Sequence, residues 1–323
     1  MNQAPEVVEQ ILRGEVRAAA RLMRDLDDGV PGAREVLKRL YPHCGRAHII
    51  GITGSPGVGK STLTDRLIQY LRQEGRTVGV VAVDPTSPFS GGAILGDRIR
   101  MQRHALDEGV FIRSLATRGH FGGLTASSRA VITVLDAMGK DYILVETVGV
   151  GQDEVEIAAT AYSTVVVTVP GLGDDIQAIK AGILEVADLL VVNKADREGA
   201  NRTYQDLMQM LDLQSIRKTK SWKPRIFLTQ AKEDQGIKEL VAGLREHQEY
   251  LGKNQGEALL AARYQRVRQE FLEMLKEGVF RNLVEQISLS GRLEEILQEI
   301  LAKSTDPYSA SEDLITSILG PGK

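Results

Sequence analysis

Short runs of consecutive Val, Ile and Leu residues dominate the middle of the chain, between about His48 and Tyr250. Most of these runs show no strict alternation of apolar and polar positions, which is typical of strands buried on both faces. Helical patterns separate them, for example over Ser61–Gln73 and Leu124–Met138. The pattern therefore predicts an α/β fold, in which helices cover both faces of a mostly parallel sheet. The expected strands are His48–Thr53, Val78–Asp84, Val110–Leu115, Tyr142–Thr147, Val165–Val169, Asp188–Asn193 and Ile226–Thr229.

The two flanking parts of the chain carry only helical patterns. Apolar residues recur at helical spacing from Val8 to Leu26, Asp27–Gly32 breaks the pattern, and a short second helix is expected over Val36–Leu40. We expect an N-terminal helical extension over residues 1–45, an α/β domain over 46–250 and a helical region over 251–323. The last region carries an apolar seam, which indicates either a helix packed on the chain's own core or an arm that pairs with a second subunit. The seam residues are Leu260, Tyr264, Val267, Phe271 and Met274.

Composition and charge narrow the class of protein. The 323 residues carry a net charge of −3, and 42% are hydrophobic, which excludes a disordered chain and a strongly basic surface for nucleic acid or an anionic membrane. The single cysteine, Cys44, excludes a disulfide framework within the chain. No apolar run approaches the ~20 residues of a membrane span, and the N-terminus lacks a signal pattern. We expect a cytoplasmic protein with neither nucleic acid nor membrane as a partner.

A phosphate-binding motif follows the first expected strand. The sequence G-x-x-x-x-G-K-S lies between that strand and a helix, which is the context that a P-loop requires. Glycines let backbone N–H groups turn toward phosphate oxygens, and the helix N-terminus adds its positive end. Lys60 would reach the β- and γ-phosphates, and the Ser61 hydroxyl would ligate Mg²⁺. We therefore predict a P-loop NTPase whose nucleotide contacts include Gly54, Ser55, Pro56, Gly57, Val58, Gly59, Lys60, Ser61 and Thr62.

A second motif indicates which base is bound. The strand that ends near Val192 runs into Asn193-Lys194-Ala195-Asp196, an N-K-x-D sequence. The aspartate would accept two hydrogen bonds from guanine that adenine does not offer, so unpaired polar groups would penalise ATP. A second base-contacting loop is expected at Thr229, Gln230 and Ala231, although that signal is weak by itself. The expected ligands are GTP and GDP.

Acidic residues near the expected strand ends are candidates for a magnesium site. Glu146-Thr147-Val148-Gly149 stands where a typical GTPase has Asp-x-x-Gly, and Val150 stands where Ras-like enzymes have the water-orienting glutamine, so slow turnover is expected. Gln152 is an alternative for that role. Asp84 and Asp97 are further candidates, since Mg²⁺ prefers oxygen ligands. Alternatively, Asp84 is a helix cap or a turn residue, and Asp97 is the N-cap of a helix over Arg98–Leu106.

Together these motifs resemble the MeaB/ArgK family, the GTPases associated with methylmalonyl-CoA mutase. The resemblance extends over nearly the whole chain, and its most specific parts are the Asp-Pro-Thr-Ser-Pro and Glu-Thr-Val-Gly-Val-Gly-Gln strings. The segments that carry it are Gly51–Thr62, Asp84–Pro88, Leu95–Met101, Ala116–Gly119, Gly122–Leu124, Glu146–Gln152, Asn193–Asp196 and Asp306–Tyr308.

The resemblance implies a homodimer with a C-terminal dimerisation arm, which hydrolyses GTP slowly and serves an adenosylcobalamin-dependent acyl-CoA mutase, first of all methylmalonyl-CoA mutase. By this resemblance, Ser61, Asp84, Asp97 and Glu146 surround Mg²⁺, and Lys60, Asp97, Glu146 and Gly149 are the catalytic candidates. Gln177 and Lys180 would contact the mutase from a switch loop.

Three alternatives remain at this stage. A nickel-type metallocentre-assembly GTPase needs Cys and His ligands, for which only His43-Cys44 lies close together in the sequence. An ATP-dependent kinase or transport-associated ATPase conflicts with the N-K-x-D motif. A nucleotide-bound adaptor without turnover is compatible with the missing glutamine.

Overall fold

A computed structural model describes residues 4–84, 101–116, 126–147, 157, 160–171, 186–215, 222–253 and 256–319. These residues form two compact units, Met1–Arg266 and Val267–Lys323. The first unit holds the sheet and the helices around it. The domain boundaries expected from the sequence, at 45/46 and 250/251, stay predictions.

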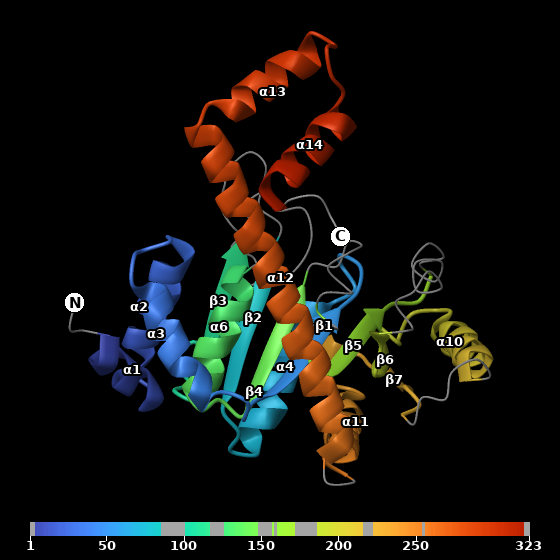
Figure 1. The fold of residues 1–323 in the computed structure, drawn as a ribbon. Coiled ribbons are helices and arrows are strands. Elements are labelled where there is room, and N and C mark those ends of the chain that lie inside the picture. The colour runs from blue at the N-terminus through green and yellow to red at the C-terminus, as the bar shows by residue number, and fades with distance from the viewer. Residues whose placement is uncertain are drawn as a thin grey trace. The chain divides into compact units, whose positions relative to one another are not determined.

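Seven parallel strands form one sheet in the order β3-β2-β4-β1-β5-β6-β7 (Figure 1). β1 lies between β4 and β5. The chain adds β2 and β3 on one side of β1 and β5, β6 and β7 on the other, and open α/β sheets bind ligands at the carboxyl ends of the strands beside such a switch point. This parallel sheet confirms the predicted α/β fold. The strands are β1 (His48–Thr53), β2 (Val78–Asp84), β3 (Val110–Ala116), β4 (Tyr142–Thr147), β5 (Ser163–Thr168), β6 (Leu189–Val192) and β7 (Arg225–Leu228).

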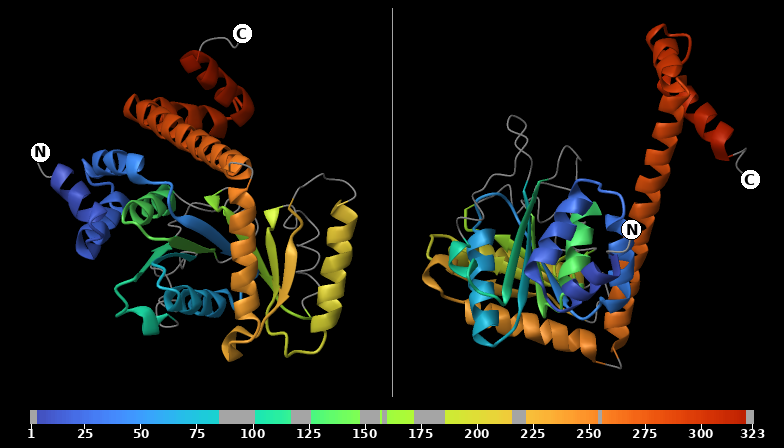
Figure 2. Two further views of the ribbon diagram at one scale, coloured as in Figure 1. Left: turned by 90° about the horizontal axis from the view of Figure 1, so that it is seen from below. Right: turned by 90° about the vertical axis from the view of Figure 1, so that its left-hand side faces the viewer.

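Helices cover both faces of the sheet, as Figures 1 and 2 show. Apolar side chains of α4 (Lys60–Gln73) and α11 (Ile237–Gly252) pack against one face of the strands. α6 (Ala126–Ala137) and α10 (Ala200–Ser215) pack against the alternate strand residues, which form the other face. Short 3-10 helices lie at η1 (Tyr41–His43), η2 (Gln102–His104) and η4 (Ala231–Glu233).

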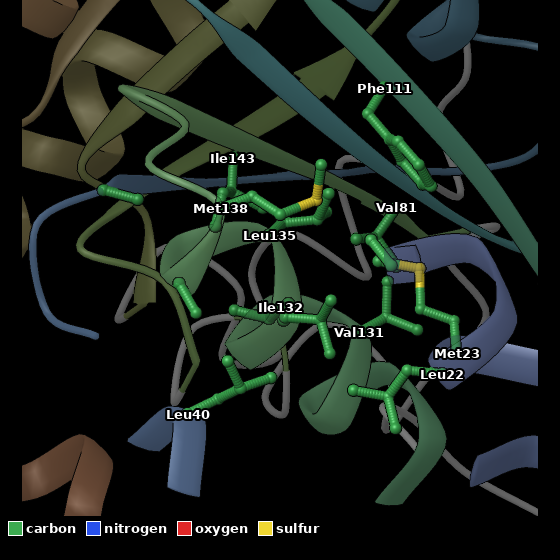
Figure 3. Packing of buried hydrophobic residues seen from close by; sticks show 14 of the residues in the cluster. Leu22, Met23, Leu40, Val81, Phe111, Val131, Ile132, Leu135, Met138 and Ile143 are labelled. Atoms are coloured by element: carbon green, nitrogen blue, oxygen red, sulfur yellow. The ribbon is translucent and has the colours of Figure 1, made fainter. Parts of the chain in front are cut away.

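The N-terminal helices form an additional layer over α6. They are α1 (Ala4–Leu12), α2 (Val16–Asp27) and α3 (Ala33–Leu40). Met23 and Leu40 are fully buried in the same cluster as Val131 and Ile132 of α6 (Figure 3). Asp136, at the end of α6, accepts hydrogen bonds from the backbone N–H groups of residues 45, 46 and 47, at 2.6, 3.1 and 3.0 Å. The three N-terminal helices and the segment that follows them are therefore held against α6 by apolar packing and by hydrogen bonds.

The helix predicted over Val8–Leu26 is wrong as a single element, because α1 ends at Leu12 and α2 begins at Val16. Gly14 has φ +82°, a conformation in which glycine is favoured. Its N–H donates to Ile11 O, and the Glu15 N–H donates to Gln10 O, so the loop satisfies carbonyls at the end of α1.

The C-terminal part is helical, as expected: α12 (Glu257–Leu289), α13 (Arg292–Leu301) and α14 (Pro307–Leu319). The five seam side chains on α12 are between 46% and 66% exposed. Both interpretations of the seam, as a helix packed on the chain's own core and as an arm that pairs with a second subunit, stay predictions. Within the described ranges, no helix is long and apolar enough to cross a membrane.

A buried polar cluster lies at the amino ends of the central strands. Ser163 Oγ, at the start of β5, is hydrogen bonded to His48 Nε2 of β1 and to His247 Nδ1 of α11, at 2.8 Å each. All three residues are at most 5% exposed. The ring of Trp222 packs against His247 at a tilt of 47°, and its Nε1–H donates to Asp188 O at 3.0 Å. The cluster ties α11 to the sheet.

Candidate functional site

The loop between β1 and α4 turns at three glycines with positive φ: Gly54 (+141°), Gly57 (+79°) and Gly59 (+98°). A Cβ at Gly54 would lie 2.0 Å from Val167 O, and a Cβ at Gly59 would lie 2.5 Å from the Asn193 amide nitrogen. Only glycine fits these two positions without displacing the neighbouring strand or side chain. The loop therefore takes the tight, backbone-exposing course on which phosphate binding depends.

Lys60 is the first residue of α4, and its side chain folds back over this loop. Its Nζ donates hydrogen bonds to Gly54 O at 2.6 Å and Ser55 O at 3.0 Å. The residue is only 7% exposed. A cation is thus fixed at the helix N-terminus, where the backbone dipoles also favour an anion.

Glu146, near the carboxyl end of β4, faces the first turn of α4. Ser61 Oγ donates to Glu146 Oε1 at 2.7 Å, and Thr64 Oγ1 donates to Glu146 Oε2 at 2.9 Å. All three residues are buried. The structure thus brings Ser61 and Glu146 together, as the sequence predicts. Thr64 was missed, although its position three residues after Ser61 places both hydroxyls on one face of the helix.

Asn193 connects the P-loop to both loops of the expected base site. Its amide Nδ2 donates to Val58 O at 2.8 Å, and its Oδ1 accepts hydrogen bonds from Thr229 Oγ1 and Ala231 N, at 3.1 Å each. The side chain is 3% exposed. One buried amide therefore fixes three segments that are far apart in the sequence.

Lys194 and Asp196 complete the N-K-x-D loop. Lys194 has φ +55°, and its Nζ donates to Gly57 O at 2.7 Å, so it covers the P-loop from outside. Asp196 is exposed, and Gln230 is half-buried. The Ala195 N–H donates to Thr229 O at 3.0 Å, which joins the two base loops through their backbones.

The remaining predicted residues are only partly described or lie outside the described residues. The backbone of Asp84 ends β2, next to β4, but its side chain lies outside the described part. Asp97, Gly149, Gln152, Gln177 and Lys180 lie outside the described residues.

The donor set fits Mg²⁺ better than a soft metal. Ser61 and Glu146 offer hydroxyl and carboxylate oxygens, the ligands that this ion prefers. Elsewhere in the described ranges, no group of three or more His, Cys, Asp or Glu side chains is arranged to hold a metal ion. His43 is exposed, and the Cys44 thiol donates to Thr133 O at 3.3 Å.

Comparison with known proteins agrees with this geometry. Residues 20–288 match the family model described as methylmalonyl Co-A mutase-associated GTPase MeaB. A Pyrococcus abyssi protein is 49% identical over 98% of this chain and 97% of its own length. The GTPase ArgK of Escherichia coli is 38% identical over 73% of each chain. The methylmalonic aciduria type A homolog of Mus musculus, a mitochondrial protein, is 33% identical over 82% of this chain and 64% of its own length.

The fold also matches a solved structure over nearly its whole length. The crystal structure of an LAO/AO transport system kinase aligns with a TM-score of 0.72 and 25% identity, covering 98% of this chain and 98% of that one.

Proposed function

Because the chain belongs to the MeaB family of methylmalonyl-CoA mutase-associated GTPases, we propose that it acts as a chaperone for an adenosylcobalamin-dependent acyl-CoA mutase, with methylmalonyl-CoA mutase as the first candidate. The family match over residues 20–288 is the observation that carries this proposal. GTP hydrolysis itself follows from membership of the family and from the P-loop fold. In the proposed role, the state of the nucleotide governs loading of the cobalamin cofactor and protection of the mutase.

The chain's own residues suggest how GTP is held. Backbone N–H groups of the P-loop and the Lys60 ammonium group bind the phosphates, and Asp196 accepts hydrogen bonds from guanine. Asn193 is hydrogen bonded to the P-loop and to the loop at Thr229–Ala231, so it holds the phosphate end and the base end of the site in a fixed relative position. These roles agree with the buried positions of Lys60 and Asn193.

Magnesium fits the hydroxyl–carboxylate pair at the start of α4. Ser61 would bind the ion directly, and Glu146 would hold it through water together with Asp84 and Asp97. When bound, Mg²⁺ supplies charge stabilisation for the phosphates. Glu146 orients the Ser61 hydroxyl by accepting its hydrogen bond, and Thr64 holds the Glu146 carboxylate by donating to its other oxygen.

Switching would involve Asp97, Gly149, Gln177 and Lys180. Segments ordered around the γ-phosphate are released after hydrolysis in many GTPases, and such a change would report the state of the nucleotide to the mutase. Slow intrinsic hydrolysis is expected, because Val150 stands where a water-orienting glutamine is usual.

Homodimerisation through α12 is part of the proposal. Its seam is exposed, and large exposed apolar patches mark sites of association. Neighbouring apolar side chains on the same helix are exposed as well: Leu272, Leu275, Val279 and Phe280. A second copy of this chain offers the same helix and would cover them.

The decisive experiment measures hydrolysis of GTP by the purified protein, alone and with cobalamin-dependent methylmalonyl-CoA mutase, and uses ATP as the control. We expect a slow rate alone and a large, saturable stimulation that is specific to GTP. Hydrolysis of GTP without stimulation would contradict the mutase assignment but leave the GTPase intact. We expect this protein and the mutase to meet in the cytoplasm.

A further inference from the structure

Arg66, on the second turn of α4, reaches a loop that lies 165 residues later in the chain. Its Nε donates a hydrogen bond to Ala231 O at 2.9 Å, and its Nη2 donates to Lys232 O at 2.9 Å. Its Nη1 donates to Gln69 Oε1 at 3.2 Å, which steadies the guanidinium on the helix. A planar fork bound to two consecutive carbonyls fixes the direction of a backbone as well as its position.

Ala231 is thereby held from both sides. Its N–H donates to Asn193 Oδ1, and its carbonyl accepts from Arg66. Its side chain is 2% exposed and packs in the cluster that α4 and α11 share. Neither peptide group next to this residue is free to rotate without breaking a hydrogen bond, so the loop has one defined course where the base site is proposed.

One helix thus carries the phosphate end and supports the base end. Lys60 begins α4, and Arg66 lies six residues further, about 9 Å along the helix axis at 1.5 Å per residue. Because a helix of this length is stiff, the separation between the P-loop and the loop at Ala231 is set by α4 itself.

We propose that Arg66 is a positioning residue for guanine recognition, which holds the loop Thr229–Ala231 at a fixed distance from the phosphate site. This inference rests on the proposed base site at Asn193–Asp196 and Thr229–Ala231. Arg66 acts through the loop, so its loss lowers affinity for guanine nucleotides and leaves the chemistry at the phosphates unchanged.

Arg72 provides a matched control on the same helix. Its Nε and Nη2 donate to the two carboxylate oxygens of Asp107, at 2.9 and 2.8 Å. Replacing it removes a bidentate arginine from α4, as Arg66→Ala does, but its partner lies outside the base loops. An effect of general damage to α4 would therefore appear in both variants.

The experiment measures dissociation constants for GDP and ADP, with kcat and KM for GTP, in the full chain and in Arg66→Ala, Arg66→Lys and Arg72→Ala. We expect Arg66→Ala to weaken GDP binding about tenfold and ADP binding less than about twofold, since the loss of two charged hydrogen bonds loosens only the base loop. KM for GTP rises by a similar factor, and kcat stays within about twofold. Arg66→Lys keeps the positive charge and one hydrogen bond to the loop, so GDP binding weakens about threefold. Arg72→Ala leaves the ratio of the GDP and ADP dissociation constants unchanged.

An unchanged GDP-to-ADP ratio in Arg66→Ala would overturn the inference, and so would an equal fall in Arg72→Ala. If Arg66→Ala does not fold, Arg66→Lys decides, because the lysine variant must still shift the ratio. A wild-type protein that does not prefer GDP to ADP would instead overturn the base site itself, so the two failures are distinguishable.

Discussion

The two ends of the central strands both bury polar side chains, but of different kinds. At the amino ends, His48, Ser163 and His247 form a closed cluster in which one hydroxyl serves two imidazoles. At the carboxyl ends, Lys60 and Glu146 are charged groups gathered around a glycine-rich loop at a helix N-terminus. The first cluster consists of two imidazoles and a hydroxyl, and the second combines an ammonium group, a carboxylate and hydroxyls.

This difference separates burial that holds the fold from burial that serves a ligand. A serine hydroxyl donates one hydrogen bond and accepts another, so the two histidines satisfy Ser163 within the protein. The P-loop instead combines backbone strain that only glycine relieves with charges that suit phosphate and Mg²⁺. The P-loop also lies at the topological switch point of the sheet, and ligands of open α/β sheets bind there, at the carboxyl ends of the strands.

The sharpest test of the contrast is the response of stability to pH. Burial lowers the pKa of His48 to about 3, helped by the neighbouring His247, and burial lowers the pKa of His247 to about 4. In the unfolded chain both would titrate near their ordinary pKa of about 6.5. Below that pH the unfolded state binds protons that the folded state does not, so the stability that these two histidines contribute is full above pH 6.5 and falls as the pH drops through 4 toward 3. At pH 5 we expect a loss of about 2 kcal/mol per histidine, about 4 kcal/mol in all.

Denaturant unfolding at pH 7.5 and pH 5.0 measures this loss. His247→Asn keeps an acceptor for Ser163 but does not titrate, so it should remove about half of the pH dependence. His43→Asn, at an exposed position, should keep all of it. Equal free energies of unfolding at the two pH values would contradict the neutral cluster.

The opposite end is tested by Lys60→Ala. Loss of the ammonium group at the phosphates should weaken GTP binding at least 100-fold, about 3 kcal/mol, because Lys60 is the cation fixed at the start of α4, beside the backbone N–H groups that bind the phosphates. Calorimetric titration with GTP measures the effect. Undiminished affinity would refute the phosphate assignment, and circular dichroism at 222 nm should show that the variant remains folded.

Base choice gives a smaller effect at the same end. Asp196→Asn should weaken GDP binding about 30-fold, about 2 kcal/mol, and improve binding of the xanthine analogue, because an amide donor matches the 2-oxo group of xanthine. Glu198→Gln, which removes an exposed acid two residues later, is the matched control and should change neither constant. Unchanged guanine preference in Asp196→Asn would remove Asp196 from the base site.

The smallest expected effect is that of Ser163→Ala. Removing the shared hydroxyl should cost about 1 kcal/mol of stability, since two buried imidazoles lose a hydrogen bond, and GDP affinity should stay within about twofold. Paired measurements of unfolding and of GDP binding give the answer. If GDP affinity falls in step with stability, the two strand ends are coupled, and the separation drawn above is wrong.

Strands were the most predictable part of the fold. Runs such as Val78–Asp84 are continuous because both faces of the strand are covered, and burial on both faces leaves a plain mark in the sequence. The break at Gly14 was missed, because glycine is tolerated inside helices and only its positive φ shows that α1 has ended.

The candidate site divides in the same way. Local motifs predicted Lys60, Ser61 and Asn193, since a P-loop and an N-K-x-D loop are contiguous in sequence. Arg66 left no such mark: its partners follow 165 and 166 residues later, and they are backbone carbonyls, whose positions no side-chain pattern records. Contacts of this kind become visible only when the sheet order has placed the segments side by side.

The layer of N-terminal helices, α1–α3, that covers α6 has a practical consequence for the expression of a minimal GTPase. A chain trimmed to begin at β1 would expose to water the apolar face of α6 that Met23 and Leu40 cover. It would also lose the three backbone N–H groups that donate hydrogen bonds to the buried Asp136 carboxylate. Such a fragment is expected to aggregate, although every nucleotide motif would remain in it.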